Sequence, residues 1–185
     1  MNISGTLNFF KVLLQPSLAI PTYSVPTFDH VPSILANLPE IHALVIDKDN
    51  CFAIDGTDSV YPKYADTWKL LQTKYPNRLL IVSNSTGTRN DGRAEILESN
   101  TGAAVLRHTT KKPGCFPDIL QYFSKHGINN PSSIAVIGDR VLTDVVMGNL
   151  NNAPSIWVSE GVELSNGIFQ VFERWLVNYL QKKNK

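Results

Sequence analysis

Two aspartates stand two positions apart directly after an apolar run: Asp47 and Asp49 follow residues 42–46, which read HALVI. In an extended chain, residues i and i+2 project to the same side, so both carboxylates can face one ligand while Lys48 points away. A carboxylate placed there can attack a phosphorus centre, and a second one can protonate the leaving oxygen and later activate water. The pair therefore indicates phosphoryl chemistry, with Asp47 as nucleophile and Asp49 as general acid and base.

Further polar side chains that could complete such a site follow three later apolar runs. They are Ser83, Asn84 and Ser85, then Lys111 and Lys112, and finally Asp139, Arg140 and Asp144. Aspartates supply the hard oxygen ligands that Mg²⁺ prefers, and the ion would mask the charge that repels an anionic nucleophile from a phosphate. The candidate ligands for Mg²⁺ are Asp47, Asp49, Asp139 and Asp144. Asp144 stands one turn into an expected helix, where it either binds the metal through water or orients Lys112.

The transferring phosphoryl oxygens need a hydroxyl and a cation, and Ser83 and Lys112 provide them. Pro113 marks a helix start and favours Lys112 as the inward lysine, with Lys111 as the alternative. The other candidates for contact with the substrate are Asn84, Ser85, Lys111 and Arg140. The nearby residues Asp55, Gly56 and Asp58 have the composition of an ordinary turn.

Alternating apolar runs and helix-like segments must position these groups. The runs lack period-two alternation, as do strands buried on both faces of a parallel sheet, and they cover residues 42–46, 78–82, 103–106, 133–137 and 154–158. Helices are expected between and after them, over residues 62–75, 89–100, 113–126, 141–150 and 165–182. The sequence predicts an α/β, doubly wound, Rossmann-like fold with a parallel sheet of about five strands, whose ligands bind at the carboxyl ends of the strands.

The two ends of the chain have their own patterns. Residues 1–40 are expected to form an N-terminal arm, because five prolines would interrupt any long helix or central strand, and a short amphipathic helix is expected over residues 3–14. Residues 41–185 then form the domain. Its last helix has an apolar face made of Phe169, Phe172, Trp175, Leu176, Tyr179 and Leu180.

Composition narrows the class of protein. The 185 residues suffice for one well-buried domain, and a net charge of +1 argues against a protein built to neutralise nucleic acid. The two cysteines, Cys51 and Cys115, form no CxxC pair, so a cysteine-rich zinc site is excluded. No apolar run approaches the length of a membrane span, which leaves a soluble or peripheral protein.

The four polar pieces resemble the motifs of the haloacid dehalogenase superfamily, subfamily IIIA: DxD at Asp47 and Asp49, the serine Ser83, the lysine Lys112 before proline, and GDxxxxD ending at Asp144. The stretches DKDNC, VSNS, HTTKKPG and GDRVLTD are most similar to the mitochondrial phosphatidylglycerophosphate phosphatases. The resemblance implies Mg²⁺-dependent hydrolysis of the terminal phosphomonoester through an aspartyl-phosphate, which yields the cardiolipin precursor phosphatidylglycerol. It also implies peripheral attachment to the matrix side of the mitochondrial inner membrane, with an anionic phospholipid as the partner.

The spacing of the motifs leaves no room for a cap domain, because one helix and one strand already fill each interval between Asp49, Ser83 and Lys112. An open crevice suits a phosphate carried on a large body such as a lipid. Alternative substrates are a soluble sugar phosphate or a nucleic-acid 3′-phosphate. A receiver-like domain that only accepts phosphate is a further alternative, although Asp49 speaks against it. Self-association is left open.

Overall fold

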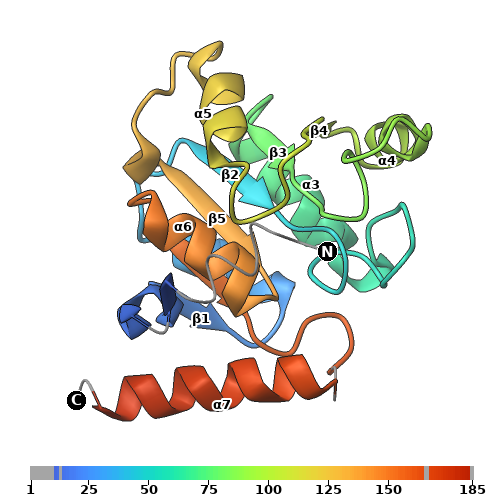
Figure 1. Ribbon diagram of the computed structural model, residues 1–185. Helices are drawn as coiled ribbons and strands as arrows, with labels where there is room; N and C mark the ends of the chain where they lie inside the picture. The colour runs from blue at the N-terminus through green and yellow to red at the C-terminus, as the bar shows by residue number, and fades with distance from the viewer. Residues whose placement is uncertain (1–10, 13, 165–166, 184–185) are drawn as a thin grey trace.

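A parallel sheet of six strands forms the centre of the protein in the computed structural model, which describes residues 11–12, 14–164 and 167–183. The spatial order is β1-β6-β5-β2-β3-β4 (Figure 1). The strands are β1 Tyr23–Val25, β2 Ala43–Ile46, β3 Leu79–Ile81, β4 Ala104–Val105, β5 Ile134–Gly138 and β6 Ser155–Val158. All five runs expected to be strands are confirmed, and so is the α/β class.

The order of the strands creates a switch point at the centre of the sheet. From β2 the chain moves outward through β3 to β4, and it then returns to place β5 on the other side of β2. In open α/β sheets, ligands bind where the chain reverses its direction of travel in this way, at the carboxyl ends of the strands. The ends of β2 and β5 therefore border the expected ligand crevice.

Helices cover both faces of the sheet because successive strand residues point to opposite sides. Leu44 and Ile46 pack into one core cluster, whereas Ala43 and Val45 pack into the other. The first face carries α2 Val31–Leu35, α3 Ala65–Lys74 and α4 Arg93–Thr101, and the second carries α5 Phe116–Ser124 and α6 Val146–Leu150. The sheet is thus doubly wound, as expected.

The expected helices are confirmed with shorter bounds. Residues 62–75 begin with a 3-10 turn at Pro62–Tyr64 before α3, and residues 141–150 begin with a π-helix at Val141–Val145 before α6. The chain from the end of β2 to Lys112 is fully described, and its helices and strands there are only the 3-10 turn, α3, β3, α4 and β4. Neither interval between Asp49, Ser83 and Lys112 therefore holds a cap domain.

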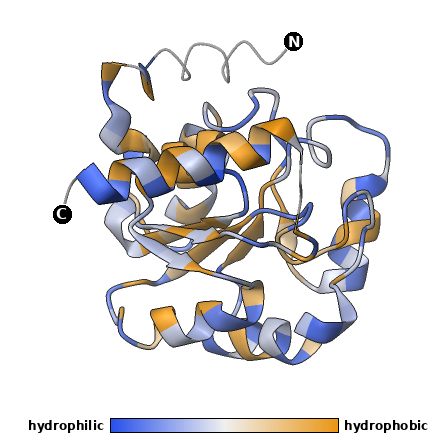
Figure 2. Cartoon of the chain, turned by 90° about the horizontal axis from the view of Figure 1, so that it is seen from below, coloured by the Kyte–Doolittle hydropathy of each residue, from blue (hydrophilic) through white to orange (hydrophobic). Residues whose placement is uncertain are grey.

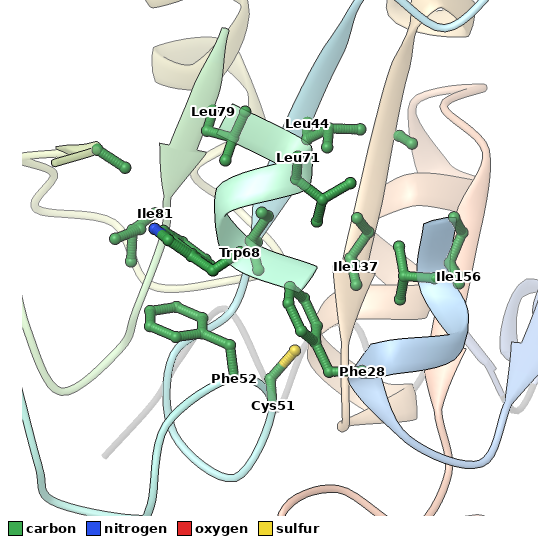
Figure 3. Close-up of a cluster of buried hydrophobic side chains, with 14 of the residues drawn as sticks. Phe28, Leu44, Cys51, Phe52, Trp68, Leu71, Leu79, Ile81, Ile137 and Ile156 are labelled. Atoms are coloured by element: carbon green, nitrogen blue, oxygen red, sulfur yellow. The ribbon is translucent and has the colours of Figure 1, made fainter. Parts of the chain in front are cut away.

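The sixth strand corrects the expectation of about five. Tyr23–Val25 pairs with β6 in parallel, although prolines surround it. The prolines are compatible with this strand because it is three residues long, lies at the edge of the sheet and stands between Pro21 and Pro26. The segment after it enters the core, where the ring of Phe28 packs against those of Phe52 and Trp68 (Figure 3). Phe28 also packs against Tyr64, with ring centroids 5.7 Å apart.

The last helix, α7 Ile168–Lys183, packs through a face that shares only Leu176 and Leu180 with the one expected. The buried residues are Glu173, Val177 and Leu180, whereas Trp175 and Tyr179 are exposed. The buried Glu173 carboxylate accepts a hydrogen bond from Nε of the partly exposed Arg140 at 3.1 Å. This ion pair and the packing of Val177 and Leu180 hold the helix with its aromatic residues facing outward.

The amphipathic helix expected over residues 3–14 lies mostly outside the described residues. Of its members, Val12 is buried beside α7, whereas Leu14 is 89% exposed. Among the described residues, none of the helices has the length and apolar character that crossing a membrane requires.

Replacing Phe28 by alanine tests whether the segment before β2 is part of the folded domain. Phe28 is fully buried, so Phe28→Ala is expected to lower the free energy of unfolding by about 3–5 kcal/mol, measured by urea denaturation. Leu14→Ala is the exposed control and is expected to change it by less than about 0.5 kcal/mol. Equal effects of the two substitutions would contradict this placement.

Candidate active site

The loops at the carboxyl ends of β2, β3 and β5 enclose a cavity of about 300 Å³. Its lining residues are Asp47, Asp49, Asn50, Asp55, Asn84, Ser85, Lys112, Asp139, Arg140, Thr143 and Gln170. Seven residues expected at the site from the sequence are among them. The other three expected residues do not line the cavity: Ser83 and Asp144 are buried, and Lys111 is exposed to solvent.

Lys112 lies between two aspartates at the floor of the cavity. Its Nζ donates to Asp47 Oδ1 at 2.6 Å and is 2.7 Å from Asp144 Oδ1. All three side chains are almost fully buried. Burial lowers the pKa of Lys112, but the carboxylates of Asp144 and Asp47 outweigh that effect and raise it above its usual value. Lys112 is therefore a permanent cation, and it is the inward lysine, as Pro113 indicated.

Three carboxylates meet beside this one ammonium group. One oxygen from each of Asp47, Asp139 and Asp144 lies within 4.8 Å of the other two. Asp139 Oδ2 accepts a hydrogen bond from Asn50 Nδ2 at 3.1 Å, whereas its Oδ1 is buried with no hydrogen-bond partner in the described part of the chain. Hard oxygen donors, excess negative charge and an unsatisfied buried carboxylate oxygen together fit a Mg²⁺ ion.

Crowding of the carboxylates changes their acidity. Burial raises the pKa of Asp47, the Lys112 ammonium opposes this, and Asp144 adds to it, so that the pKa reaches about 6. Burial together with the negative charges of Asp47 and Asp144 raises the pKa of Asp139 well above its usual value. The metal-free site therefore resists full ionisation, which is what a site built to hold a cation would do.

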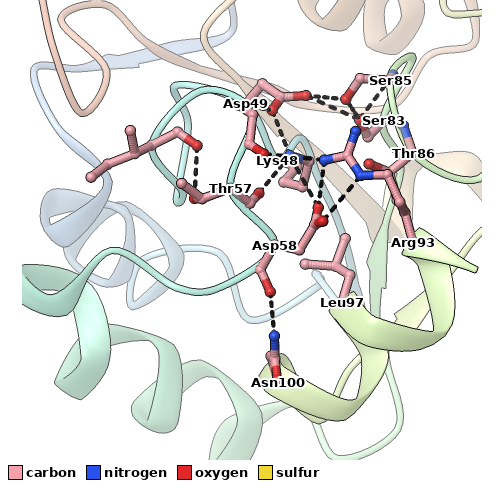
Figure 4. Close-up of polar contacts among 12 residues, drawn as sticks. Lys48, Asp49, Thr57, Asp58, Ser83, Ser85, Thr86, Arg93, Leu97 and Asn100 are labelled. Atoms are coloured by element: carbon pink, nitrogen blue, oxygen red, sulfur yellow. Dashed lines mark hydrogen bonds and ion pairs between the residues drawn. The ribbon is translucent and has the colours of Figure 1, made fainter.

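Asp49 lies apart from that carboxylate cluster. Its Oδ1 accepts hydrogen bonds from Lys48 Nζ at 2.5 Å and from the backbone N–H of Gly56 at 3.1 Å. Its Oδ2 accepts from Ser83 Oγ at 3.3 Å and also from Ser85 Oγ (Figure 4). The structure thus does not bring Asp49 among the potential metal ligands, because protein donors already occupy both of its oxygens.

These donors keep Asp49 ionised. Burial acts to raise its pKa, but the hydrogen bonds from Lys48 and Ser85 outweigh burial and lower it. Strand alternation predicts that Lys48 points away from the cavity, and Lys48 is indeed absent from the cavity lining. Its side chain nevertheless turns back, so that the fully buried ammonium group contacts Asp49. Strand alternation does not predict this contact, because it gives the direction of the Cα–Cβ bond and not the position of the end of a long side chain.

Asp58 is more than the turn residue that its neighbours suggested. Its carboxylate accepts two hydrogen bonds from Arg93, at 2.8 and 3.0 Å, and lies 3.6 Å from Lys48 Nζ (Figure 4). Arg93 lies at the start of α4, so this pair connects the loop after β2 to a helix far along the chain. The expected turn is present at Asp55 and Gly56, and Asp58 in addition supports the loop that carries Asp49.

The remaining candidates hold the loops together around the cavity. Ser83 Oγ accepts from the backbone N–H groups of Ser85 and Thr86, so it shapes the loop after β3. Asn84 Oδ1 accepts from the backbone N–H of Lys112 at 2.8 Å and joins that loop to the lysine. Arg140 lines the cavity while its Nε donates to Glu173.

Asn50, Asp55, Thr143 and Gln170 also line the cavity, and the sequence analysis did not assign them to it. Asn50 had a signal, since Asn tolerates the left-handed conformation and here has a φ of 56° directly after Asp49. Its side chain bridges Asp139 and the backbone N–H of Glu163. Gln170 had no sequence signal that would place it at the cavity, because α7 reaches the cavity only through tertiary packing.

Gly138 permits the close approach of Asp144. A Cβ at this position would lie 2.3 Å from the Asp144 carboxylate carbon, far inside van der Waals contact. Asp144 Oδ2 also accepts from the backbone N–H of Arg140 at 3.1 Å, which keeps its carboxylate over the glycine. The glycine before Asp139 is thus part of the geometry that brings the carboxylates together.

A parallel sheet with carboxylates from β2 and β5 and a lysine at its switch point defines a phosphatase of the haloacid dehalogenase type. The family described as mitochondrial PGP phosphatase matches residues 3–163, and the chain belongs to this family.

Two fungal proteins are similar to the chain over nearly their whole length. The mitochondrial phosphatidylglycerophosphatase GEP4 of Saccharomyces cerevisiae is 45% identical, and the match covers 97% of this chain and 99% of that protein. A probable mitochondrial phosphatidylglycerophosphatase of Schizosaccharomyces pombe is 28% identical over 100% of this chain and 95% of that protein. No solved structure matches the chain significantly.

The charge imbalance predicts how the metal-free protein responds to pH. The folded-state pKa of Asp47, about 6, lies above the usual 3.8, so ionising Asp47 weakens the fold as pH rises from about 4 to 6. Asp47→Asn lacks this titration, so its stability relative to the parent should rise by on the order of 3 kcal/mol between those limits. The measurement is urea denaturation in EDTA across that pH range. A difference between parent and variant that is independent of pH would contradict the assignment.

Proposed function

We propose that this chain is a Mg²⁺-dependent phosphatidylglycerophosphate phosphatase that releases the terminal phosphate and leaves phosphatidylglycerol. The observation that carries the proposal is the Asp47 carboxylate, which lies at the carboxyl end of β2, in the cavity lining, beside Lys112 and Asp139. Membership of the family and the names of the two fungal relatives support the choice of substrate.

In the first step, Asp47 attacks the phosphorus of the terminal phosphomonoester. A bond forms between its carboxylate oxygen and phosphorus while the bond to the glycerol oxygen breaks, and the phosphoryl group is transferred to Asp47. Lys112 is 2.6 Å from Asp47, so its ammonium group can stabilise the negative charge of the transferring phosphoryl oxygens.

Asp49 moves the protons. The departing glycerol oxygen takes a proton from Asp49, and Asp49 then removes a proton from the water that attacks the phosphoryl-Asp47. Water oxygen bonds to phosphorus, Asp47 is restored and inorganic phosphate leaves. Since Asp49 is ionised in the free protein, it must gain its proton with the substrate, whose phosphate charge favours protonation of a neighbouring carboxylate.

Mg²⁺ would be held by Asp47 and Asp139, with Asp144 behind them, and would supply positive charge between the anionic nucleophile and the anionic phosphate. Asp144 also holds Lys112, so the structure supports both of the roles considered for it. Arg140 and the exposed Ser85 lie at the cavity, where they can contact the rest of the head group.

Mitochondrial localisation is supported by the family description and by the names of both fungal relatives. Peripheral attachment to the matrix side of the inner membrane is part of the proposal. It is supported by an uncapped cavity, since a lipid that stays in a bilayer can present only its head group to the protein.

The decisive experiment is phosphate release with Mg²⁺ from phosphatidylglycerophosphate, compared with a soluble sugar phosphate and a 3′-phosphorylated oligonucleotide. We expect a kcat/KM at least tenfold higher for the lipid, and no turnover for Asp47→Asn beyond about 10⁻³ of the parent. Asp55→Asn is the matched control, because Asp55 lines the same cavity without contacting Lys112. Appreciable turnover by Asp47→Asn would contradict the nucleophile assignment, and faster hydrolysis of a soluble phosphate would contradict the substrate.

Arg140→Gln tests whether this guanidinium binds the second phosphate of the lipid. We expect KM for phosphatidylglycerophosphate to rise about tenfold with little change in kcat. The substitution removes a charged hydrogen bond to the second phosphate, and this loss weakens binding of the substrate and of the transition state equally. A soluble phosphomonoester without a phosphodiester is expected to show a smaller change. Equal changes in KM for both substrates would assign Arg140 to the reacting phosphate instead.

A further inference from the structure

Helix α7 presents a continuous stripe of large apolar side chains to solvent. Its members are Ile168, Phe172, Trp175 and Tyr179, which are 86%, 38%, 57% and 51% exposed. Positions separated by four, three and four residues fall on one side of a helix. We call these four residues the outer stripe.

The outer stripe is opposite the side that holds α7 on the domain. That inner side buries Glu173, Val177 and Leu180, so the helix is already anchored without the outer stripe. Figure 1 shows α7 along one margin of the protein, and Figure 2, seen from below, shows hydrophobic colour along this helix and hydrophilic colour at its C-terminal end. The stripe thus adds nothing to the described core, and it needs another explanation.

The aromatic rings of the stripe contact one another in series, and those of Trp175 and Tyr179 are stacked. The centroids of Phe172 and Trp175 are 5.9 Å apart, and those of Trp175 and Tyr179 are 5.5 Å apart with planes inclined by 13°. Trp and Tyr combine an apolar body with a polar tip, a combination that favours the boundary between water and lipid. The rings form one apolar surface with hydrogen-bonding groups at its edges.

The charges of α7 are suited to an anionic surface. The helix carries Arg174, Lys182 and Lys183, and its one carboxylate, Glu173, is 1% exposed and bonded to Arg140. Lys182 and Lys183 are exposed, whereas Arg174 is partly buried in a small cavity that Gln170 and Glu173 also line. The solvent-facing side of the described part of α7 therefore carries two lysines and no exposed carboxylate. A second copy of this chain would bring the same cations to the stripe, whereas anionic lipid head groups would neutralise them.

We propose that the outer stripe of α7 docks the protein onto the head-group region of an anionic lipid bilayer. This inference rests on the proposed function, in which the substrate is an anionic phospholipid. Trp175 and Tyr179 enter the interface, and the lysines at the end of the helix contact lipid phosphates.

Docking through α7 would bring the membrane close to the cavity. Gln170, from the first turns of the same helix, lines the cavity, and Glu173 holds Arg140 at its wall. The helix that contacts the lipid surface is thus the one that completes the cavity, so a head group emerging beside it has a short path to Asp47.

Vesicle flotation tests the docking surface directly. The parent chain is expected to bind phosphatidylcholine vesicles that contain phosphatidylglycerol at least about tenfold more tightly than pure phosphatidylcholine vesicles. The double variant Trp175→Ser/Tyr179→Ser should bind the anionic vesicles at least about tenfold more weakly than the parent. Turnover of soluble p-nitrophenyl phosphate should stay unchanged, which shows that the variant is folded.

The matched control is Leu70→Ser/Ile96→Ser. These apolar residues are 53% and 52% exposed on α3 and α4, on the other face of the sheet, and their loss should leave vesicle binding unchanged. Unchanged vesicle binding by the stripe variant would overturn the proposal. So would a parent dimer that the stripe variant converts to monomer without losing vesicle binding, because the stripe would then bind a second copy.

Tryptophan fluorescence gives a second readout that does not depend on the variant's folding. Trp175 is exposed, whereas Trp68 and Trp157 are 4% and 6% exposed, so vesicle-induced changes report on Trp175. Anionic vesicles should shift the parent's emission to shorter wavelength, and Trp175→Phe should lose the shift while still binding. An unchanged emission spectrum on bound vesicles would overturn the proposal.

Failure of the proposed function has a different signature. If the parent releases no phosphate from phosphatidylglycerophosphate in detergent micelles, the substrate assignment fails, whereas stripe-dependent binding to anionic vesicles would still support the docking surface. Conversely, suppose that the parent is fully active in micelles and that the stripe variant binds vesicles as tightly as the parent. This result would overturn the proposed docking surface and leave the proposed function standing.

Discussion

Three crowded carboxylates lie around one buried ammonium group that pairs with two of them, and the rest of the site depends on this unequal balance of charge. Asp47 and Asp144 contact Lys112, and Asp139 lies beside both carboxylates, because β2 and β5 are neighbouring parallel strands whose ends meet. Buried charge is costly unless it is compensated, so this cluster is unfavourable without a cation and favourable with one. Gly138 permits the crowding, since any side chain there would displace Asp144.

The loop that carries Asp47 and Asp49 is anchored to the core of the domain. Directly after Asp49 and Asn50, the side chain of Phe52 enters the core and packs against Trp68 at 4.4 Å between ring centroids. Lys48 fixes Asp49 from the side, and Asp58 connects the loop to Arg93. A loop anchored at so many points can hold the proposed nucleophile and the proposed proton donor at fixed positions, which is what catalysis by positioning requires.

Helix α7 lines the cavity on one side and presents exposed aromatic residues on the other. Its buried Glu173 holds Arg140 at the cavity, and the same rotation of the helix turns Trp175 and Tyr179 outward. The same helix therefore contributes to the wall of the cavity and carries the exposed aromatic residues. Since the described residues form no cap domain, the proposed docking through this helix would select substrates by their location in a membrane as well as by their contacts in the cavity.

The sequence alone determined the α/β class, five of the six strands and the meeting of Asp47, Lys112 and Asp139, because buried strands and their polar ends have a strong local pattern. It did not reveal β1, since a three-residue edge strand between prolines has almost no pattern of its own. Only the tertiary structure decided which face of α7 is buried and that Lys48 reaches back to Asp49. Those outcomes depend on partners distant in sequence or on long flexible side chains, and periodicity carries no information about either.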